Sequence, residues 1–167
     1  MRVLVVYATK MGGTRGLAEM VGHTLEEEGV DAVVAAADEI RDVTGFDAVV
    51  VGGALYAFRW HKDARRFVRR HREDLSTMPV WLFSSGPLDD SASAEDIDPV
   101  RGVAAAMRRI GARGHVTFGG RMPADATGFP AAAMARDNTG DWRDPDHVAA
   151  WTREVVAELR RPAVPVD

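Results

Sequence analysis

Apolar residues along this chain form two alternating patterns, continuous short runs and stripes at helical spacing. Residues 3–8 are apolar at every position, which predicts a strand buried on both faces of a sheet. Leu17, Val21 and Leu25 instead form one side of a helix that should end at Gly29. These patterns predict strands at residues 3–8, 32–37, 47–53, 80–83 and 116–118, and helices at 15–28, 62–75, 99–110 and 145–159.

The regular alternation of strands and helices predicts an α/β fold, with a parallel sheet covered by helices on both faces. We expect one domain over residues 1–161, followed by a frayed tail at 162–167. Asp98 and Asp144 each precede a proline and are predicted to cap the helices that follow. Residues 119–141 have no clear periodicity, and both a substrate-covering loop and disorder remain open for them.

Composition excludes several kinds of chemistry. The chain has 21 basic and 25 acidic side chains, a net charge of −4, which does not favour nucleic-acid binding. It has no cysteine, which excludes disulfides, thiolate catalysis and iron–sulfur clusters. None of the five histidines has a convincing metal-ligand spacing with a carboxylate. The longest apolar run, residues 48–58, is too short to span a membrane, so we expect no transmembrane segment and a cytoplasmic protein.

Candidate ligand residues follow the first, third and fourth predicted strands, because ligands collect at the carboxyl ends of parallel strands. The first loop reads T-x-x-G-x-T from Thr9 to Thr14 and leads into a helix, whose free amides attract phosphate. Its lysine precedes the glycines, unlike a Walker loop, and its glycine spacing is not that of a dinucleotide site. A loop for one terminal phosphate remains, as does an ordinary strand-to-helix turn. Ser84-Ser85 does not fit the nucleophile elbow of a hydrolase.

The order of strand, T-x-x-G-x-T and helix resembles the FMN-phosphate loop of the flavodoxin family. The segments 53–62 and 79–88 resemble the flavodoxin-domain subfamily that includes menaquinone-dependent protoporphyrinogen oxidase. The resemblance implies a three-layer flavodoxin-like fold with a five-stranded sheet in the order 2-1-3-4-5, and FMN as cofactor. It implies cofactor binding by Thr9, Lys10, Met11, Gly12, Gly13, Thr14, Ala54, Leu55, Tyr56, Ala57, Phe58, Trp60, Ser84, Ser85, Gly86, Pro87, Leu88 and Asp89.

Several functions remain open within this resemblance. The first is an FMN-dependent oxidoreductase of unknown substrate, the second a menaquinone-dependent protoporphyrinogen IX dehydrogenase, and the third an electron shuttle to a protein partner. A flavin-free binding domain is the weakest alternative. No side chain is expected to be a catalyst, because the flavin carries the chemistry. If Arg59, His61 and Lys62 lie near the ring, they should stabilise the anionic reduced flavin and favour two-electron chemistry.

Partner surfaces are less defined. Five arginines lie on the helix predicted over 62–75 and form either a solvated face or a docking surface for an acidic redox partner. A quinone and a homodimer closed over the cofactor are further partners that the resemblance leaves open.

Overall fold

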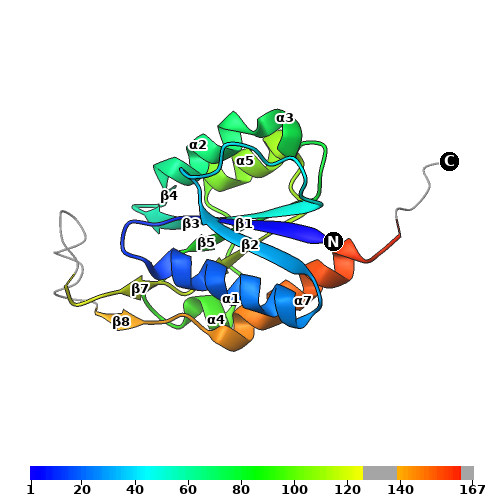
Figure 1. The fold of residues 1–167 in the computed structure, drawn as a ribbon. Helices are drawn as coiled ribbons and strands as arrows, with labels where there is room; N and C mark the ends of the chain where they lie inside the picture. Colours follow the sequence, from blue (N-terminus) through cyan, green and yellow to red (C-terminus); the bar gives the residue numbers. More distant parts are fainter. Residues whose placement is uncertain (126–138, 163–167) are drawn as a thin grey trace.

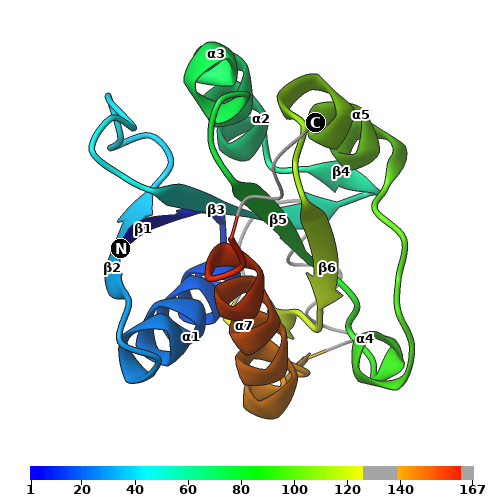
Figure 2. The same ribbon diagram turned by 90° about the vertical axis from the view of Figure 1, so that its right-hand side faces the viewer.

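In the computed structural model, which describes residues 1–125 and 139–162, a parallel sheet lies between two layers of helices (Figures 1 and 2). Neighbouring strands of the main sheet are parallel throughout its path. Their order is β2 (Asp31–Ala36), β1 (Arg2–Ala8), β3 (Ala48–Tyr56), β5 (Val80–Ser85) and β6 (Gly114–Phe118). The predicted α/β class and the 2-1-3-4-5 order are therefore confirmed, since these are the five predicted strands in that order.

Helices cover both faces of the sheet. One face carries α1 (Gly13–Glu27) and α7 (Pro145–Leu159), and the other carries α2 (Lys62–Arg70), α3 (Arg72–Leu75) and α5 (Arg101–Ile110), as Figure 2 shows. In β1, Val3 and Val5 pack into the cluster under α1 and α7, whereas Leu4 and Val6 pack into the cluster under α2 and α5. All four are 0% exposed, which explains the uninterrupted apolar run of this strand.

Two helix boundaries follow the predicted signals. Gly29 has φ 76°, and the adjoining amide of Val30 donates to the Leu25 carbonyl, so the chain leaves α1 through a left-handed glycine. The Asp144 side chain accepts hydrogen bonds from the amides of Asp146 and His147, which confirms it as the N-cap of α7.

Two other predicted boundaries are wrong. Asp98 does not cap a helix, because Pro99 and Val100 continue the preceding segment and α5 begins only at Arg101. That segment is held beside β6, where the Thr117 hydroxyl donates to the Ile97 carbonyl at 3.4 Å. The helix predicted over 62–75 is divided at His71, whose ring packs on Phe67 with a centroid distance of 4.7 Å.

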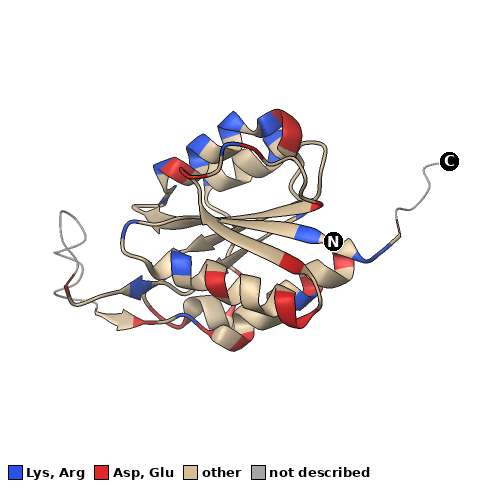
Figure 3. Cartoon of the chain, in the orientation of Figure 1, with Lys and Arg blue, Asp and Glu red and all other residues tan. Residues whose placement is uncertain are grey.

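Short elements that the apolar pattern did not predict lie near the carboxyl ends of the strands. They are β4 (Arg59–Trp60), which pairs with β3, the four-residue helix α4 (Ser91–Ala94), and the paired strands β7 (Arg121–Met122) and β8 (Gly140–Asp141). Two-residue strands are too short to show periodicity. Within 119–141, residues 126–138 lie outside the described part of the chain. Figure 3 shows basic positions concentrated along α2, whereas acidic positions outnumber basic ones on α1 and α7 of the opposite helix layer.

Candidate functional site

Three loops meet at the carboxyl edge of the sheet and enclose a cavity of about 70 Å³. They follow β1, β3 and β5, as the sequence predicted from strand direction. Eleven predicted ligand residues line this cavity: Thr9, Met11, Gly13, Thr14, Ala54, Leu55, Tyr56, Ala57, Ser85, Gly86 and Leu88. The fold thus brings residues from three distant parts of the chain to one point.

The loop after β1 presents free hydrogen-bond donors. Gly12 is the N-cap of α1, with φ 82°, and its amide donates to the Thr9 hydroxyl at 3.0 Å. In the described residues, the amides of Gly13, Thr14 and Arg15 have no hydrogen-bond partner. These amides form the first turn of a helix, where the helix dipole is positive. The arrangement suits an anion.

A buried hydrogen bond joins the first loop to the third. The hydroxyls of Thr14 and Ser85 lie 2.9 Å apart, and both residues are almost fully buried. Ser84 points elsewhere, because its hydroxyl lies 3.0 Å from Nε2 of His115. Only one of the two serines therefore lines the cavity, as expected from the alternation of side chains along a strand.

The second loop is a two-residue β-hairpin with unusual residues at its tip. β3 and β4 pair antiparallel through Leu55 with Trp60 and Tyr56 with Arg59, and Ala57 and Phe58 have φ 47° and 61°. Both tip positions favour glycine or asparagine, so the turn is strained. Phe58 is 87% exposed, which makes it the most exposed large apolar side chain of the described residues.

Trp60, which the sequence analysis assigned to the cofactor, lies in the core. It is 2% exposed and belongs to the core cluster that also contains Val51 and Phe67. A Cβ at Gly53 would lie 2.4 Å from the indole Nε1 of Trp60, so only glycine allows this packing. That nitrogen has no partner among the described residues.

A second cavity of about 650 Å³ adjoins the first and shares Thr9 and Tyr56 with it. Its lining is strongly basic, and Asp63 is the single acidic residue among the described residues that line it. The basic residues are Lys10, Arg59, His61, Lys62 and Arg65. The lining therefore carries a net positive charge that can attract an anion.

His61 and Tyr56 are both partly buried in this second cavity. Nδ1 of His61 accepts a hydrogen bond from the Asp63 amide at 3.1 Å, so His61 is the N-cap of α2. Burial lowers the pKa of His61, and the carboxylate of Asp63 opposes this shift only in part. Burial also raises the pKa of the Tyr56 phenol, with a smaller opposite effect from the Lys10 amide. Both side chains are thus uncharged near neutral pH.

Residues that the sequence analysis missed close one side of the first cavity. Gly120, Arg121 and Met122, in and next to β7, line it. The Arg143 side chain then connects this hairpin to α1: it pairs with Asp141 at 2.7 Å and donates to the Gly13 carbonyl at 3.4 Å. The glycine pair at 119–120 is a sequence signal that could have indicated a close backbone approach here, since a Cβ at Gly119 would lie 2.0 Å from the Trp142 carbonyl oxygen.

The other predicted ligand residues lie around the cavity rather than in its lining. Lys10 and Trp60 line the second cavity. The Pro87 carbonyl accepts from the Gly120 amide, and Asp89 accepts from the Ser91 amide at 2.9 Å. In the described ranges there is no group of three metal-ligating side chains, and no helix is long and apolar enough to cross a membrane.

Comparisons with known proteins agree with this architecture. Protoporphyrinogen IX dehydrogenase [quinone] from Escherichia coli K12 and that from Escherichia coli O157:H7 are each 30% identical to the chain over 86 residues. The match covers 50% of this chain and 48% of each relative, so the chain aligns with about half the length of these curated relatives.

Solved structures show the fold independently. Oxidised flavodoxin 1 from Bacillus cereus superposes with a TM-score of 0.62 at 14% identity, over 94% of this chain and 98% of that one. An H90D mutant of the flavo di-iron protein from Thermotoga maritima superposes with a TM-score of 0.64 at 16% identity, over 95% of this chain and 36% of that one. The family model for the flavodoxin domain matches residues 4–125. The chain therefore belongs to the flavodoxin-domain family, whose cofactor is FMN.

Proposed function

We propose that the chain is an FMN-dependent oxidoreductase in which the first turn of α1 binds the cofactor phosphate. The unpaired amides of Gly13, Thr14 and Arg15 are the observation that carries this proposal. A phosphate at a helix N-terminus satisfies such amides and lies at the positive end of the helix dipole. The hydroxyls of Thr9 and Thr14 line the same cavity and add donors.

The rest of the lining suits the flavin ring. Leu55, Tyr56, Leu88 and Met122 supply apolar and aromatic surface around the first cavity. Flat ring systems bind between side chains of this kind. The ring would lie between the hairpin at Ala57 and the segment after β5. The second cavity adds open volume on the far side of Tyr56, within the usual range of about 300–1,000 Å³ for ligand sites.

FMN, when bound, supplies the transfer of one or two electrons. The protein's contribution would be electrostatic. Arg59 and Lys62 line the second cavity beside Tyr56, and they would favour a negatively charged reduced ring over the neutral oxidised one. His61 would add little charge at neutral pH, because burial lowers its pKa. We therefore expect a higher flavin potential than an acidic surrounding would give.

Binding can be tested with a matched pair of threonines in α1. Thr14 and Thr24 are both buried, but only Thr14 lies at the helix N-terminus. Thr14→Val should weaken FMN binding by about tenfold, the loss of one good hydrogen bond, while Thr24→Val should leave it unchanged. Quenching of FMN fluorescence on titration into cofactor-free protein measures both. A protein that takes up no FMN would refute the proposal.

The electrostatic role can be tested by potentiometry. Arg59→Gln together with Lys62→Gln should lower the flavin midpoint potential by roughly tens of millivolts, because two positive charges beside the ring are lost. Arg69→Gln with Arg70→Gln removes the same charge from the far end of α2 and serves as the control. Equal shifts of the midpoint potential in both double variants would mean that Arg59 and Lys62 have no more influence on the flavin than distant charges.

A second candidate function rests on the basic cavity and the curated relatives. Those relatives are named protoporphyrinogen IX dehydrogenase [quinone], and protoporphyrinogen carries two carboxylates. The cations of Lys10, Arg59, Lys62 and Arg65 could pair with such groups. Anaerobic mixing of the FMN-loaded protein with protoporphyrinogen and menaquinone would show porphyrin fluorescence if this function holds. This function is excluded if porphyrin fluorescence rises no faster with the protein than with free FMN alone.

A third candidate is an electron shuttle, supported by the arginines of α2. Arg65, Arg66, Arg69 and Arg70 occupy one nine-residue helix beside the proposed site. A basic face next to a redox centre suits an acidic protein partner. Electron transfer to cytochrome c, a basic protein, should then be slower than to an acidic acceptor at low salt, and salt should remove the difference. Equal rates with both acceptors would count against this function.

A further inference from the structure

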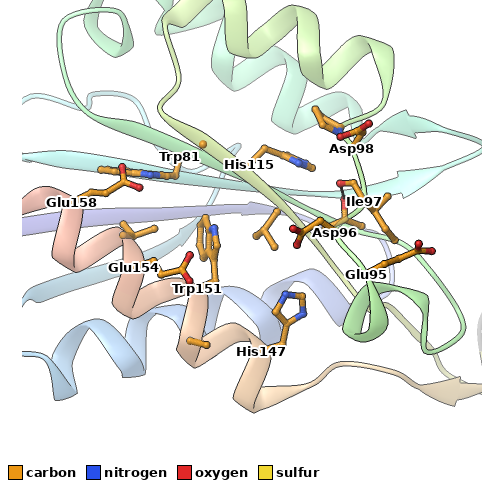
Figure 4. Close-up of a pocket in the computed structure, with 16 residues that line it drawn as sticks. Trp81, Glu95, Asp96, Ile97, Asp98, His115, His147, Trp151, Glu154 and Glu158 are labelled. Carbon is orange, nitrogen blue, oxygen red and sulfur yellow. Dashed lines mark hydrogen bonds between the residues drawn. The ribbon is translucent and has the colours of Figure 1, made fainter.

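A cavity of about 530 Å³ lies along the free edge of β6, away from the loops of the proposed cofactor site (Figure 4). Four consecutive residues of β6, Gly114 to Thr117, line it. Successive side chains of a strand point to opposite faces of the sheet, so a cavity over one face would meet only every second residue. This cavity is therefore a groove along the strand edge.

The main chain of β6 has free hydrogen-bonding groups in this groove. The Arg113 amide donates to the Val80 carbonyl of β5. The main-chain groups of residues two apart on a strand point the same way, so the main-chain groups of His115 also face β5. Gly114 and Val116 consequently direct their amides and carbonyls outward. β6 is the last strand of the main sheet path among the described residues. A strand edge without a partner strand is a template for another strand.

Carboxylates flank the groove on both sides. Glu154 and Glu158 belong to α7, as Figure 4 shows. Glu95, Asp96 and Asp98 belong to the segment between α4 and α5. Arg113 stacks on the ring of Trp81 at 5.6 Å, but among the described residues the lining itself contains no lysine or arginine. Over the described ranges, none of these carboxylates takes part in an ion pair: Glu95, Asp96, Asp98, Glu154 and Glu158.

The groove has further features of a binding surface. The Trp151 ring lies in its lining and is only partly buried. Nδ1 of His115 is buried and has no hydrogen-bond partner in the described part of the chain, whereas Nε2 of the same ring contacts the Ser84 hydroxyl. Unsatisfied groups of this kind are rare in native structures and call for an explanation.

We propose that the β6 edge binds an extended, basic segment of a partner protein as an additional strand. Main-chain bonds to Gly114 and Val116 would supply affinity, as in other cases of strand addition. Side chains of an added strand alternate between the two faces, where Glu154 and Glu158 lie on one side and Asp96 and Asp98 on the other. Lysine or arginine at every second position would thus meet the carboxylates of one face.

This surface is independent of the proposed FMN site. The groove and the first cavity share no lining residue in the described part of the chain. Loss of FMN binding would therefore leave the docking proposal standing, and failure of docking would leave the cofactor proposal standing.

The probe is a short blocked peptide that alternates lysine and valine, titrated into the whole FMN-loaded protein by calorimetry at low salt. Binding should slow hydrogen exchange at the Gly114 and Val116 amides by about tenfold. Two further peptides carry main-chain N-methyl groups either at the lysines or at the valines. One of these two should lose binding and the other should keep it, because only one set of amides can face β6.

Charge variants complete the test. Glu154→Gln with Glu158→Gln should weaken peptide binding about fivefold or more, whereas Glu26→Gln with Glu27→Gln, on α1 and outside the groove, should not. The proposal is overturned if the peptide does not bind, if both methylated peptides bind alike, or if spermine binds as tightly as the peptide.

Discussion

His115 should make the stability of this protein depend on pH. Burial lowers its pKa from 6.5 to about 4, so the ring is neutral in the folded state between those values but protonated when the chain unfolds. Stability should therefore be fully present above pH 6.5 and fall as the pH drops towards 4. Each pKa unit corresponds to about 1.4 kcal/mol, which gives a total loss of about 3 kcal/mol, of which about 2 kcal/mol is lost by pH 5.

Urea unfolding at pH 7 and pH 5, at a fixed FMN concentration, measures this loss. In His115→Gln the amide nitrogen can take the place of Nε2 towards Ser84, but the side chain does not titrate. The wild-type protein should lose about 2 kcal/mol more than this variant between the two pH values. His23→Gln changes an exposed histidine, with 73% of its side chain accessible, and should behave as wild type. Equal pH slopes in the wild type and His115→Gln would refute the reasoning.

Three glycine-related predictions follow from backbone geometry. Gly16→Ala should weaken FMN binding, measured by fluorescence, because a Cβ there would lie 2.1 Å from Nη1 of Arg143. Gly102→Ala is the control, because a Cβ there meets nothing within 4 Å. Ala57→Gly should raise the free energy of unfolding by about 0.5–1 kcal/mol, because φ 47° strains alanine; urea unfolding measures this gain. No gain would mean that the turn is relaxed. Gly52→Ala should unfold the protein or nearly so, seen by circular dichroism, because its Cβ would lie 2.0 Å from a core phenylalanine ring.

Local chemistry in the sequence was enough to predict the main elements. The run at residues 3–8 indicated a strand with two buried faces, and Gly29 and Asp144 marked helix ends through their own backbone and side-chain preferences. The loop from Thr9 to Thr14 was expected at a helix N-terminus, and α1 does begin within it at Gly13. These features depend on a few neighbouring residues, so the sequence alone determined them.

Contacts between distant residues were decided only by the tertiary structure. Asp98 carries a helix-start signal, yet the segment 95–99 lies beside β6, and α5 begins later. Ser84 and Ser85 look equivalent in sequence, but strand alternation turns one to His115 and the other to Thr14. Arg121 and Arg143 lie far from the first loop in sequence, Arg143 by 130 residues from Gly13, and only the packing of β7 and α7 against α1 brings them there. Local propensity cannot report such contacts, because their energy exists only after the sheet has assembled.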